Sequence, residues 1–459
     1  MKKFTLIFVA TLMFSNVHVA QSCLEAGITL HDQQSIDNFP ADYPDCIEIL
    51  GDVTIGLGYD NDITDLSGLS NIQHIEGFLY LQENPNLENL DGLDALESIG
   101  GYLEIYGNAS LNSLSGLVAL ETIGGDLIFY ENHELVNFSG LDALTSVGGV
   151  MEIGYHESLN SFTGLGSLTG VGGIDMAYVS NLTDFSGLNA LGSINGNVLL
   201  ASCEGISSTN GLNVLTTVSG DLFLNGLVSL ASLTGLENLN TIGGQLRLLS
   251  SPVVDLTPLG NLTSVGGSLE ISGCNALTDL SGLQGLISIG GELVIGSNQS
   301  LATLSGINNI APQSITNLAI RYNPLLSACE TESVCNYLLA PGGTIWIFDN
   351  AEGCNSQEEV ESACEGTSIQ EFNPNIKLKV HPNPFSNELQ FNYHLEETQH
   401  VKIILYNQLG MMVDLTEVYQ SKGENSLMLS LSDLPEGVYH YSVQTAMSVY
   451  SGKVYRRAE

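Results

Sequence analysis

The chain has few basic residues. Its 459 residues include 11 Lys and Arg against 51 Asp and Glu, which gives a formal net charge of -40. Between Gln21 and Asn375 only Arg247 and Arg321 are basic. DNA and RNA are polyanions that bind to cationic surfaces, so this composition excludes a nucleic-acid partner and argues against an anionic membrane surface. Hydrophobic residues make up 43% of the chain, which predicts a packed protein rather than a disordered acidic tail.

The sequence also lacks an apolar run long enough to span a bilayer stably, so we expect no transmembrane segment. Its start, "MKKFTLIFVATLMFSNVHVA", combines two Lys with a short apolar run. This pattern is typical of a secretory signal peptide, here residues 1–20 with cleavage after Ala20. The following "AQSC" loosely resembles a lipobox, so Cys23 is either lipidated or part of a disulfide bond.

Glycine pairs recur through the middle of the chain. The step is 24 residues, twice shortened to 23, and Asn195-Gly196 and Ser219-Gly220 stand in place of two pairs. The pairs lie at residues 100–101, 124–125, 148–149, 172–173, 243–244, 266–267 and 290–291. A phosphate-binding loop occurs once per site, whereas a motif that recurs at a fixed step is a structural repeat. We therefore interpret the pairs as corners of the fold, where Gly permits a sharp bend.

Each repeat has the same apolar skeleton, whose spacing starts at three residues and ends at two. One example is Leu87, Leu90, Leu93, Leu96, Ile99, Leu103 and Ile105. Period two predicts a short strand, and period three suits tight turns or 3₁₀ corners. One repeat cannot fold alone, so the repeats must stack and their ends need caps. The predicted fold is mainly β: a right-handed parallel β-solenoid of about 12 coils over residues 51–326, with strands from near Val53 to near Ile345 and caps at 21–50 and 327–366.

One further position of the repeat is regular, three residues after the last inward residue of each strand. It holds Asn84, Asn108, Asn132, His156, Val179, Cys203, Leu227, Ser251, Cys274, Asn298 and Asn323. An inward Asn there can bond the backbone of the turn in coil after coil, and the position resembles the Asn/Cys position of leucine-rich repeats. With the frame "LxxLxxLxxIGGxLxI", residues 23–366 resemble the receptor L domain, the leucine-rich solenoid of growth-factor-receptor ectodomains. The resemblance implies a fold and identifies no ligand.

The eight cysteines fall into two groups. Cys203 and Cys274 share the inward position about three coils apart, roughly 14 Å by the strand spacing, which is too far for a disulfide, so we expect two buried free thiols. The others flank the repeats: Cys23, Cys46, Cys329, Cys335, Cys354 and Cys364. They fit disulfide-stapled caps in an oxidising compartment. The last four allow three pairings. We favour Cys329–Cys354 with Cys335–Cys364; zinc is the alternative, although no close CxxC pair is present.

The C-terminal part differs in composition. Seven of the 11 Lys and Arg lie after Ile376, and the stretch "EGTSIQEFNPN" before it predicts a linker at residues 367–376. Beyond the linker, segments such as "NSLMLSLSDLPEGVYHYSVQT" alternate apolar and polar residues between turns. This pattern predicts a small antiparallel β-sandwich over residues 377–459.

The same segment resembles the C-terminal sorting domain of the type IX secretion system. The matching residues are Pro382, Asn383, Pro384, Tyr406, Gly410, Leu434, Pro435, Gly437, Tyr439 and Lys453. The resemblance implies a Bacteroidetes-type Gram-negative cell, the type IX secretion machinery as a partner, and export through the periplasm to the outer-membrane surface or the medium. The alternative is an ordinary carbohydrate-binding or fibronectin-like sandwich.

Parallel strands present one broad sheet surface, which repeat proteins commonly use for recognition. The outward residues predicted to bind a ligand are Tyr80, Glu104, Tyr106, Tyr130, Glu152, Tyr155 and Tyr178. Aromatic rings beside carboxylates can stack on sugars or dock a protein, and a cation-rich partner would associate rapidly with so acidic a chain. The alternative is that tyrosine simply suits strands and covers the sheet.

Two clusters raise the question of a metal ion. His133 and His156 fall in adjacent coils near glutamates, and either a metal bridges them or they are turn residues on a solvated edge. The stretch "YDNDITD" at residues 59–65 clusters three Asp. It either holds Ca²⁺ or forms a solvated acidic turn, since the Gly and Glu of an EF-hand loop are absent. We expect no cofactor, with Ca²⁺ kept as an open alternative.

Motifs of common enzymes are absent: the chain has no GxSxG, HExxH, GxxxxGK[ST] or GxGxxG. A hydrolase needs a pair of carboxylates, and one outward row holds Glu104, Glu152, Asp175 and Glu270, where a suitable pair arises by chance. A lyase acting on uronates needs cations, but Arg247 and Arg321 lie about three coils apart. We therefore expect a secreted or surface-attached binding or adhesion protein that is not an enzyme. A carbohydrate-active enzyme and a structural surface-layer component are the alternatives.

Overall fold

The computed structural model describes residues 22–58, 61–367, 378–407, 411–445 and 449–457. The expected signal peptide at residues 1–20, nearly all of the expected linker and Gly410 lie outside these ranges. The chain divides into two units, Met1–Glu361 and Ser362–Glu459. The first is a parallel β-solenoid of about 14 turns, and the second is built of antiparallel sheets.

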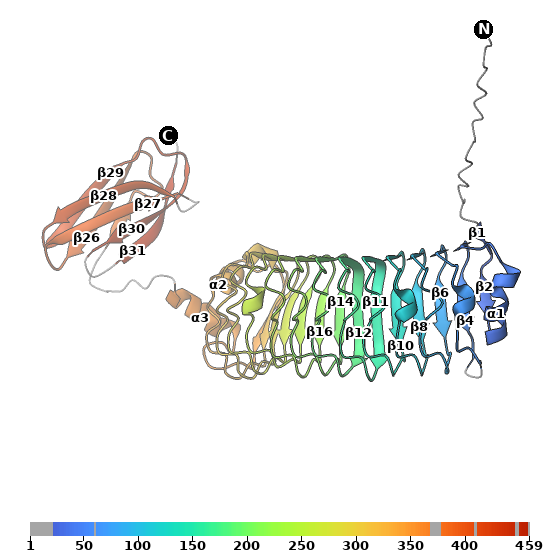
Figure 1. The fold of residues 1–459 in the computed structure, drawn as a ribbon. Coiled ribbons are helices and arrows are strands. Elements are labelled where there is room, and N and C mark those ends of the chain that lie inside the picture. The colour runs from blue at the N-terminus through green and yellow to red at the C-terminus, as the bar shows by residue number, and fades with distance from the viewer. Residues whose placement is uncertain (1–21, 59–60, 368–377, 408–410, 446–448, 458–459) are drawn as a thin grey trace, which may run out of the picture. The chain divides into compact units, whose positions relative to one another are not determined.

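The main sheet of the solenoid receives one strand from each turn, and each strand pairs in parallel with those of the neighbouring turns (Figure 1). The period of two is visible in β8 (Leu103–Tyr106), where residues 103 and 105 are buried and residues 104 and 106 are half-exposed. The other strands are β2 (Ile28–Leu30), β4 (Val53–Gly56), β6 (Leu79–Gln82), β10 (Leu127–Tyr130), β11 (Ser146–His156), β12 (Gly170–Val179), β14 (Val198–Ala201), β16 (Leu222–Asn225), β18 (Leu246–Leu249), β20 (Leu269–Ser272), β22 (Leu293–Gly296), β23 (Leu318–Arg321) and β24 (Ile345–Phe348). The expected strands are confirmed, and β2 extends the sheet into the segment expected to be only a cap.

A second ladder of two-residue strands runs along one corner of the turns, and several of these strands directly precede a glycine pair. These strands are β1 (Ser22–Cys23), β3 (Glu48–Ile49), β5 (His74–Ile75), β7 (Ser98–Ile99), β9 (Thr122–Ile123), β13 (Ser193–Ile194), β15 (Thr217–Val218), β17 (Thr241–Ile242), β19 (Ser264–Val265) and β21 (Ser288–Ile289). The N–H of Gly125 donates to the carbonyl of Gly101, and the N–H of Gly149 donates to the carbonyl of Gly125. Because these backbone donors are used between turns, the pairs act as corners and not as phosphate loops.

Short 3₁₀ helices form corners in some of the turns, and α-helices lie toward the two ends of the solenoid (Figure 1). The expected 3₁₀ corners occur as η1 (Ser67–Leu69), η2 (Ser115–Leu117), η3 (Thr257–Leu259) and η4 (Pro312–Ser314). At one end, α1 (Gln33–Asp42) begins after Asp32, whose side chain accepts a hydrogen bond from the N–H of Ser35 at 2.8 Å. At the other end, α2 (Glu332–Leu339) lies between β23 and β24, and α3 (Gln357–Thr367) follows β24.

Disulfide bonds staple both ends of the solenoid. Cys23 bonds to Cys46 and Cys329 bonds to Cys354, with Cα–Cα distances of 5.7 and 5.6 Å. Cys335 and Cys364 are disulfide-bonded as well. The favoured Cys329–Cys354 bond is therefore confirmed, and the Cys23 sulfur belongs to a disulfide rather than to a lipid anchor. The other two cysteines, Cys203 and Cys274, are buried free thiols as predicted.

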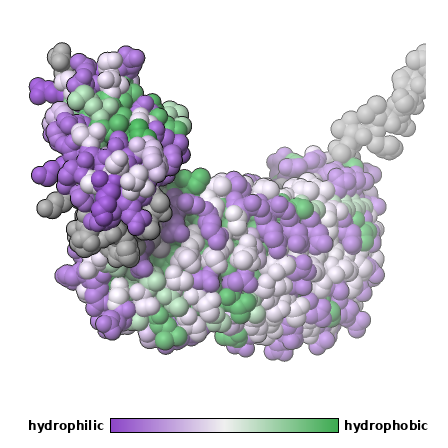
Figure 2. Space-filling view, turned by 90° about the vertical axis from the view of Figure 1, so that its left-hand side faces the viewer, coloured by the Kyte–Doolittle hydropathy of each residue, from purple (hydrophilic) through white to green (hydrophobic). Residues whose placement is uncertain are grey.

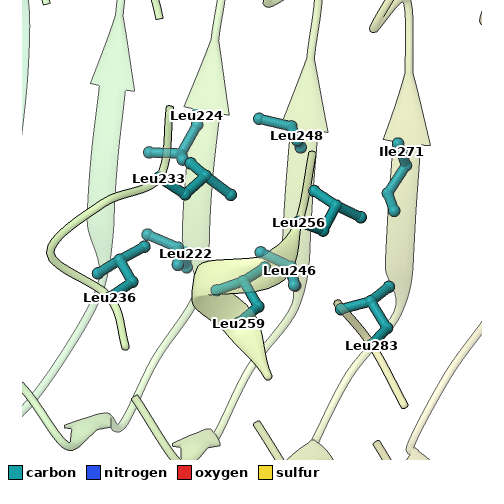
Figure 3. A pocket seen from close by; sticks show the side chains of 10 residues that line it. All are labelled: Leu222, Leu224, Leu233, Leu236, Leu246, Leu248, Leu256, Leu259, Ile271 and Leu283. Carbon is teal, nitrogen blue, oxygen red and sulfur yellow. The ribbon is translucent and has the colours of Figure 1, made fainter. Parts of the chain in front are cut away.

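The interior is filled by the leucine skeleton. Leucines of the strands face leucines from the opposite side of the turn, as Leu222 and Leu246 do with Leu236 and Leu259 (Figure 3). The cavity between them measures about 10 Å³ and is lined by Leu and Ile alone. Two similar cavities, beside Leu30 and beside Phe185, are equally small. Apolar voids of this size hold no ligand, so the search for a site turns to the surface.

Buried asparagines form a hydrogen-bonded ladder where the strands end. Nδ2 of Asn108 donates to the carbonyl of Leu81 at 3.1 Å, and its Oδ1 accepts from the N–H of Asn84 at 3.0 Å. The same pattern links Asn108 to Asn132. At the far end it links Asn298, Asn323 and Asn350. Between these two blocks the ladder position holds His156, Val179, Cys203, Leu227, Ser251 and Cys274, so the ladder is interrupted in the middle turns.

The C-terminal unit has two antiparallel sheets around one core, as predicted. The three-stranded sheet has the order β25 (Lys379–His381), β26 (Glu388–Leu395) and β29 (Gly423–Ser430). The four-stranded sheet has the order β28 (Met412–Gln420), β27 (Gln399–Tyr406), β30 (Gly437–Gln444) and β31 (Val449–Arg456). Phe385, Phe391, Leu405 and Tyr439 are among the buried core residues.

Candidate functional site

The outward side chains of strands β6 to β12 form rows, because parallel strands pair residue with residue. Tyr80, Glu104, Ile128, Glu152 and Asp175 are successive register partners, and all five are half-exposed. The strand spacing of about 4.8 Å places neighbours in this row side by side. The predicted row is therefore present, and Glu152 lies directly beside Asp175.

This row carries unbalanced negative charge. Within the described ranges, no salt bridge involves Glu104, Glu152 or Asp175. Partial burial raises the pKa of all three carboxyl groups, and neighbouring carboxylates raise the pKa of Glu104 and Glu152 further. Burial and the nearby acids also raise the pKa of Tyr80 to about 12. A positively charged ligand would relieve this repulsion.

Replacing one of these acids is expected to stabilise the protein. Because the folded-state pKa of Glu152 is raised, stability is lost as the pH rises from the ordinary value of 4.5 through the folded value. Glu152→Gln should therefore raise the free energy of unfolding at pH 7 by about 0.5 kcal/mol, the size of a cross-strand pair. The gain should vanish below pH 4.5, where the carboxyl is protonated in both states. Urea unfolding at the two pH values measures the difference.

The matched control for this prediction is Glu270, which lies in the same row. Its carboxylate accepts a 2.7 Å hydrogen bond from Nε of Arg247, and Arg247 also lies 4.9 Å from the centroid of the Phe223 ring. Glu270→Gln removes an attraction instead of a repulsion and should not stabilise. If Glu152→Gln were less stable than the parent protein at pH 7, the unbalanced repulsion at Glu152 would be disproved.

Three tyrosine rings form a shelf, here called the tyrosine shelf, at the ends of β10, β11 and β12. The ring of Tyr130 lies 6.2 Å from that of Tyr155, which stacks on Tyr178 at 4.9 Å with an interplanar angle of 25°. Tyr130 can lie across β11 because its register partner is Gly154, where a Cβ atom would collide with the ring. Tyr106 is the register partner of Tyr130 and continues the row toward the N-terminal turns.

The backbone of Tyr155 and Tyr178 is strained. Both residues have φ of +58°. The equivalent positions of other turns share this left-handed conformation, both where they hold glycine, as at Gly107 and Gly226 with φ of +66° and +65°, and where they hold another residue, as at Glu131 with φ of +56°. A side chain in this conformation costs about 1–3 kcal/mol. The two tyrosines are 49% and 53% exposed, so burial does not offset this cost. Because this conformation recurs along the stack, it is the two exposed and stacked rings that mark the position as a candidate recognition site.

A surface hollow of about 400 Å³ opens beside the tyrosine shelf. It is lined by His133, Tyr155, His156, Glu157, Tyr178, Ser180 and Asn181. The strands that lead into it, β11 and β12, are 11 and 10 residues long, and their register shifts between Val147 and Val150. The shift coincides with one of the two shortened repeat steps. The hollow was not predicted from the sequence. The repeat step of 23 instead of 24 residues is the signal that could have pointed to it.

His156 gives the wall of the hollow an unused acceptor. It is 1% exposed, and its Nδ1 lies 2.9 Å from the carbonyl oxygen of Asn132, which can only accept, so Nδ1 carries the proton. Burial lowers the pKa of His156, so the ring is neutral at pH 7 and Nε2 is an acceptor. Among the described residues Nε2 has no hydrogen-bond partner, and the same is true of Nδ1 of His133. A buried acceptor without a donor costs about 1–3 kcal/mol.

The two clusters considered for metal ions are not arranged as metal sites in the described part of the chain. Among the described residues, no three His, Cys, Asp or Glu are placed so that they could hold a metal ion together. The expectation that both histidines lie on a solvated edge is wrong for His156, which is buried in the ladder. In "YDNDITD", residues 59–60 lie outside the described ranges. Asp62 accepts from the N–H of Gln33 at 2.9 Å and Asp65 from the N–H of Ser67 at 2.8 Å, so these acids position the first residues of α1 and η1.

The leucine skeleton, the glycine corners and the asparagine ladder together make up a repeat solenoid, and comparison with known protein families agrees. Residues 45–137 match the receptor L domain. Residues 379–455 match the secretion system C-terminal sorting domain. No curated protein matches the chain.

The receptor L domain match covers only part of the solenoid. It includes Tyr80, Glu104, Tyr106 and Tyr130, whereas β11, β12 and the hollow lie beyond residue 137. The resemblance was expected over residues 23–366, so the match is narrower than the expectation. The same parallel register nevertheless continues to β24.

The sorting domain match assigns export to the C-terminal unit. Such a domain implies the type IX secretion machinery as a partner and secretion to the cell surface or the extracellular space. No helix in the described part of the chain is both long and apolar enough to cross a bilayer.

In the sorting domain, motif residues from its two ends meet. Nδ2 of Asn383 donates to the carbonyl of Lys453 at 3.3 Å, and its Oδ1 accepts from the N–H of Tyr455 at 2.9 Å. The hydroxyl of the buried Tyr439 donates to the carbonyl of Pro435 at 2.6 Å. The remaining described motif residues are Pro382 and Pro384 on either side of Asn383, Tyr406 at the end of β27, Leu434, and Gly437 at the start of β30.

Arg456 holds the same two ends together and was not predicted. Its Nε donates to the carbonyl of Ser386 at 2.9 Å, and its two amino groups reach the carbonyls of Leu434 and Ser432. Figure 2 shows hydrophobic residues exposed among hydrophilic ones on this unit. Its large exposed apolar side chains are Met411, Met412, Leu415, Tyr419, Met428 and Tyr455.

Proposed function

We propose that the protein is a secreted or surface-attached binding protein that acts in adhesion and is not an enzyme. Its ligand contacts the tyrosine shelf and the neighbouring carboxylate row on strands β6 to β12. The observation that carries the proposal is the pair of Tyr155 and Tyr178, stacked at 4.9 Å, half-exposed and held at φ of +58°. The two family matches support it, because one is a binding-type solenoid and the other directs export.

The carboxylate pair of Glu152 and Asp175 is the feature on which an enzymatic function would rest. An acid and a base need surroundings that push their pKa values apart. Partial burial instead raises the pKa of both residues, and both lie on the open sheet face. These facts support binding over hydrolysis. Release of sugars from a polysaccharide by the purified protein, lost in Glu152→Gln, would contradict the proposal.

Loss of the shelf ring of Tyr130 together with the neighbouring ring of Tyr106 is expected to weaken ligand binding at least tenfold. The full chain is applied to arrays of glycans and of surface proteins, with and without Ca²⁺, beside the double variant Tyr106→Ala/Tyr130→Ala. Each exposed aromatic contact contributes about 1 kcal/mol, and about 1.4 kcal/mol is a tenfold change in affinity. The dissociation constants of every ligand found on the arrays provide the measurement.

Tyr322→Ala is the matched control for this experiment. Tyr322 is 48% exposed at the same turn position, with φ of +59°, but it packs against Phe348 at 5.3 Å near the opposite end of the sheet. Its loss should leave binding unchanged. Equal binding by the parent protein and Tyr106→Ala/Tyr130→Ala would show that the tyrosines only cover the sheet, and the absence of any ligand would contradict the proposal.

A further inference from the structure

We infer that the hollow at the ends of β11 and β12 receives the cationic head group of a lysine or arginine side chain carried by a basic polypeptide. The inference rests on the proposed binding function and names the chemical class of the partner. Charge, ring geometry and hydrogen-bonding capacity each support it.

The acidic residues near the hollow are not balanced by Lys or Arg from the same part of the sequence. No lysine or arginine occurs between Lys3 and Arg247. Glu157 lines the hollow itself. Glu152 and Asp175 lie three residues before Tyr155 and Tyr178 on the same two strands, with no salt bridge in the described part of the chain. An anionic sugar or phosphate would be repelled from this position, whereas a cation would be attracted.

The rings beside the hollow suit a cation. Ammonium and guanidinium groups are attracted to the face of an aromatic ring, and the attraction grows when the cation is partly desolvated. Tyr155 and Tyr178 line the hollow and are about half exposed.

The hydrogen-bonding capacity of the wall selects for a donor. Nε2 of His156 is a buried acceptor without a partner among the described residues, and His156 lines the hollow. Ammonium and guanidinium groups have donors and no acceptors, so they match the Glu157 carboxylate that lines the hollow, and contact with the buried Nε2 requires the His156 ring to be uncovered when the ligand binds. A sugar hydroxyl can also donate to Nε2, but it leaves the negative charge of the hollow uncompensated.

The test titrates a hexalysine peptide into the full chain by calorimetry at physiological ionic strength, where long-range attraction between net charges is screened. Tyr155→Leu/Tyr178→Leu removes both rings without changing the net charge, and we expect at least a tenfold loss of affinity. Tyr155→Phe/Tyr178→Phe keeps both rings and should restore most of the affinity. His156→Asn places at this ladder position the residue found at Asn132, removes the free acceptor, and should weaken binding at least threefold.

Tyr322→Leu is the matched control and should bind hexalysine like the parent protein. If the Leu pair binds hexalysine as tightly as the parent protein, the attraction is only that of net charges and the inference is wrong. A neutral oligosaccharide whose binding is lost in the Leu pair would also overturn it, while leaving the proposed binding function intact. Zinc binding that disappears in His156→Asn would instead assign the hollow to a metal ion. The array experiment with Tyr106→Ala/Tyr130→Ala tests the proposed function separately.

Discussion

Removal of residues 367–459 is expected to abolish delivery to the cell surface. These residues contain the sorting domain, which is the part of the chain that matches a secretion system signal. In a Bacteroidetes host with type IX machinery, the truncated protein should accumulate in the periplasm. Its amount on the surface should fall to that of a host without the machinery. Protease treatment of intact cells, followed by fractionation, measures both pools.

The cut after Gly366 separates a sorting defect from a folding defect. It keeps Cys364, which is disulfide-bonded, with the solenoid. The truncated protein in the periplasm should therefore be folded and protease-resistant. In the converse control, residues 367–459 fused to a periplasmic reporter should carry the reporter to the surface or the medium. Normal surface display of the truncated protein would refute the assignment of the sorting domain.

Gly116→Ala is expected to destabilise the solenoid by about 3 kcal/mol, at the upper end of overpacking effects. Gly116 lies in η2, and a Cβ atom there would collide with the backbone carbonyl of Leu90 in the turn before. The side chain of Leu90 is fully buried in the stack, so its backbone cannot move aside without disturbing neighbouring turns. Chemical unfolding of the full chain followed by circular dichroism measures the change.

Gly166→Ala is the matched control, because a Cβ atom there would meet nothing within 4 Å. The same substitution should change the free energy of unfolding by less than about 0.5 kcal/mol. Alanine also reduces the conformational entropy of the unfolded chain, which favours a slight stabilisation. Equal effects at the two positions would contradict the explanation that glycine is required at residue 116 because neighbouring turns approach each other closely there.

Much of the outward face of the main sheet could be predicted from the sequence, because a fixed repeat step determines which residues lie side by side on neighbouring strands. Residues 24 apart in a parallel stack lie on neighbouring strands, so the repeat step alone pairs Glu104 with Ile128 and Tyr106 with Tyr130, and the sheet register confirms both pairs. The strand β2 was missed because residues 21–50 contain no glycine pair and therefore do not show the repeat frame.

The hollow and the sorting domain contacts depend on information that spacing does not contain. The repeat spacing already places His156 at the inward ladder position, where it is buried, whereas the hollow beside it depends on how the surrounding side chains pack. Asn383 and Lys453 meet across 70 residues because the segment between β25 and β26 runs beside the last strand, where Phe385 forms a parallel bridge with Arg456, and their pairing is set by packing in three dimensions. Single-sequence patterns describe neighbours along a regular stack better than contacts between irregular loops.

The interrupted asparagine ladder has a consequence for how the molecule responds to ligands. A stack in which each turn touches only its neighbours behaves as a linear chain of coupled units. Side-chain hydrogen bonds reinforce the coupling among the turns of Asn84, Asn108 and Asn132 and again among those of Asn298, Asn323 and Asn350. The middle turns lack this asparagine ladder and are coupled by backbone pairing, apolar packing and other side-chain acceptors such as Asn197 and Asp221. The hollow lies where the first block ends, so a ligand that contacts both β11 and β12 would add coupling between turns at the position where the asparagine ladder stops.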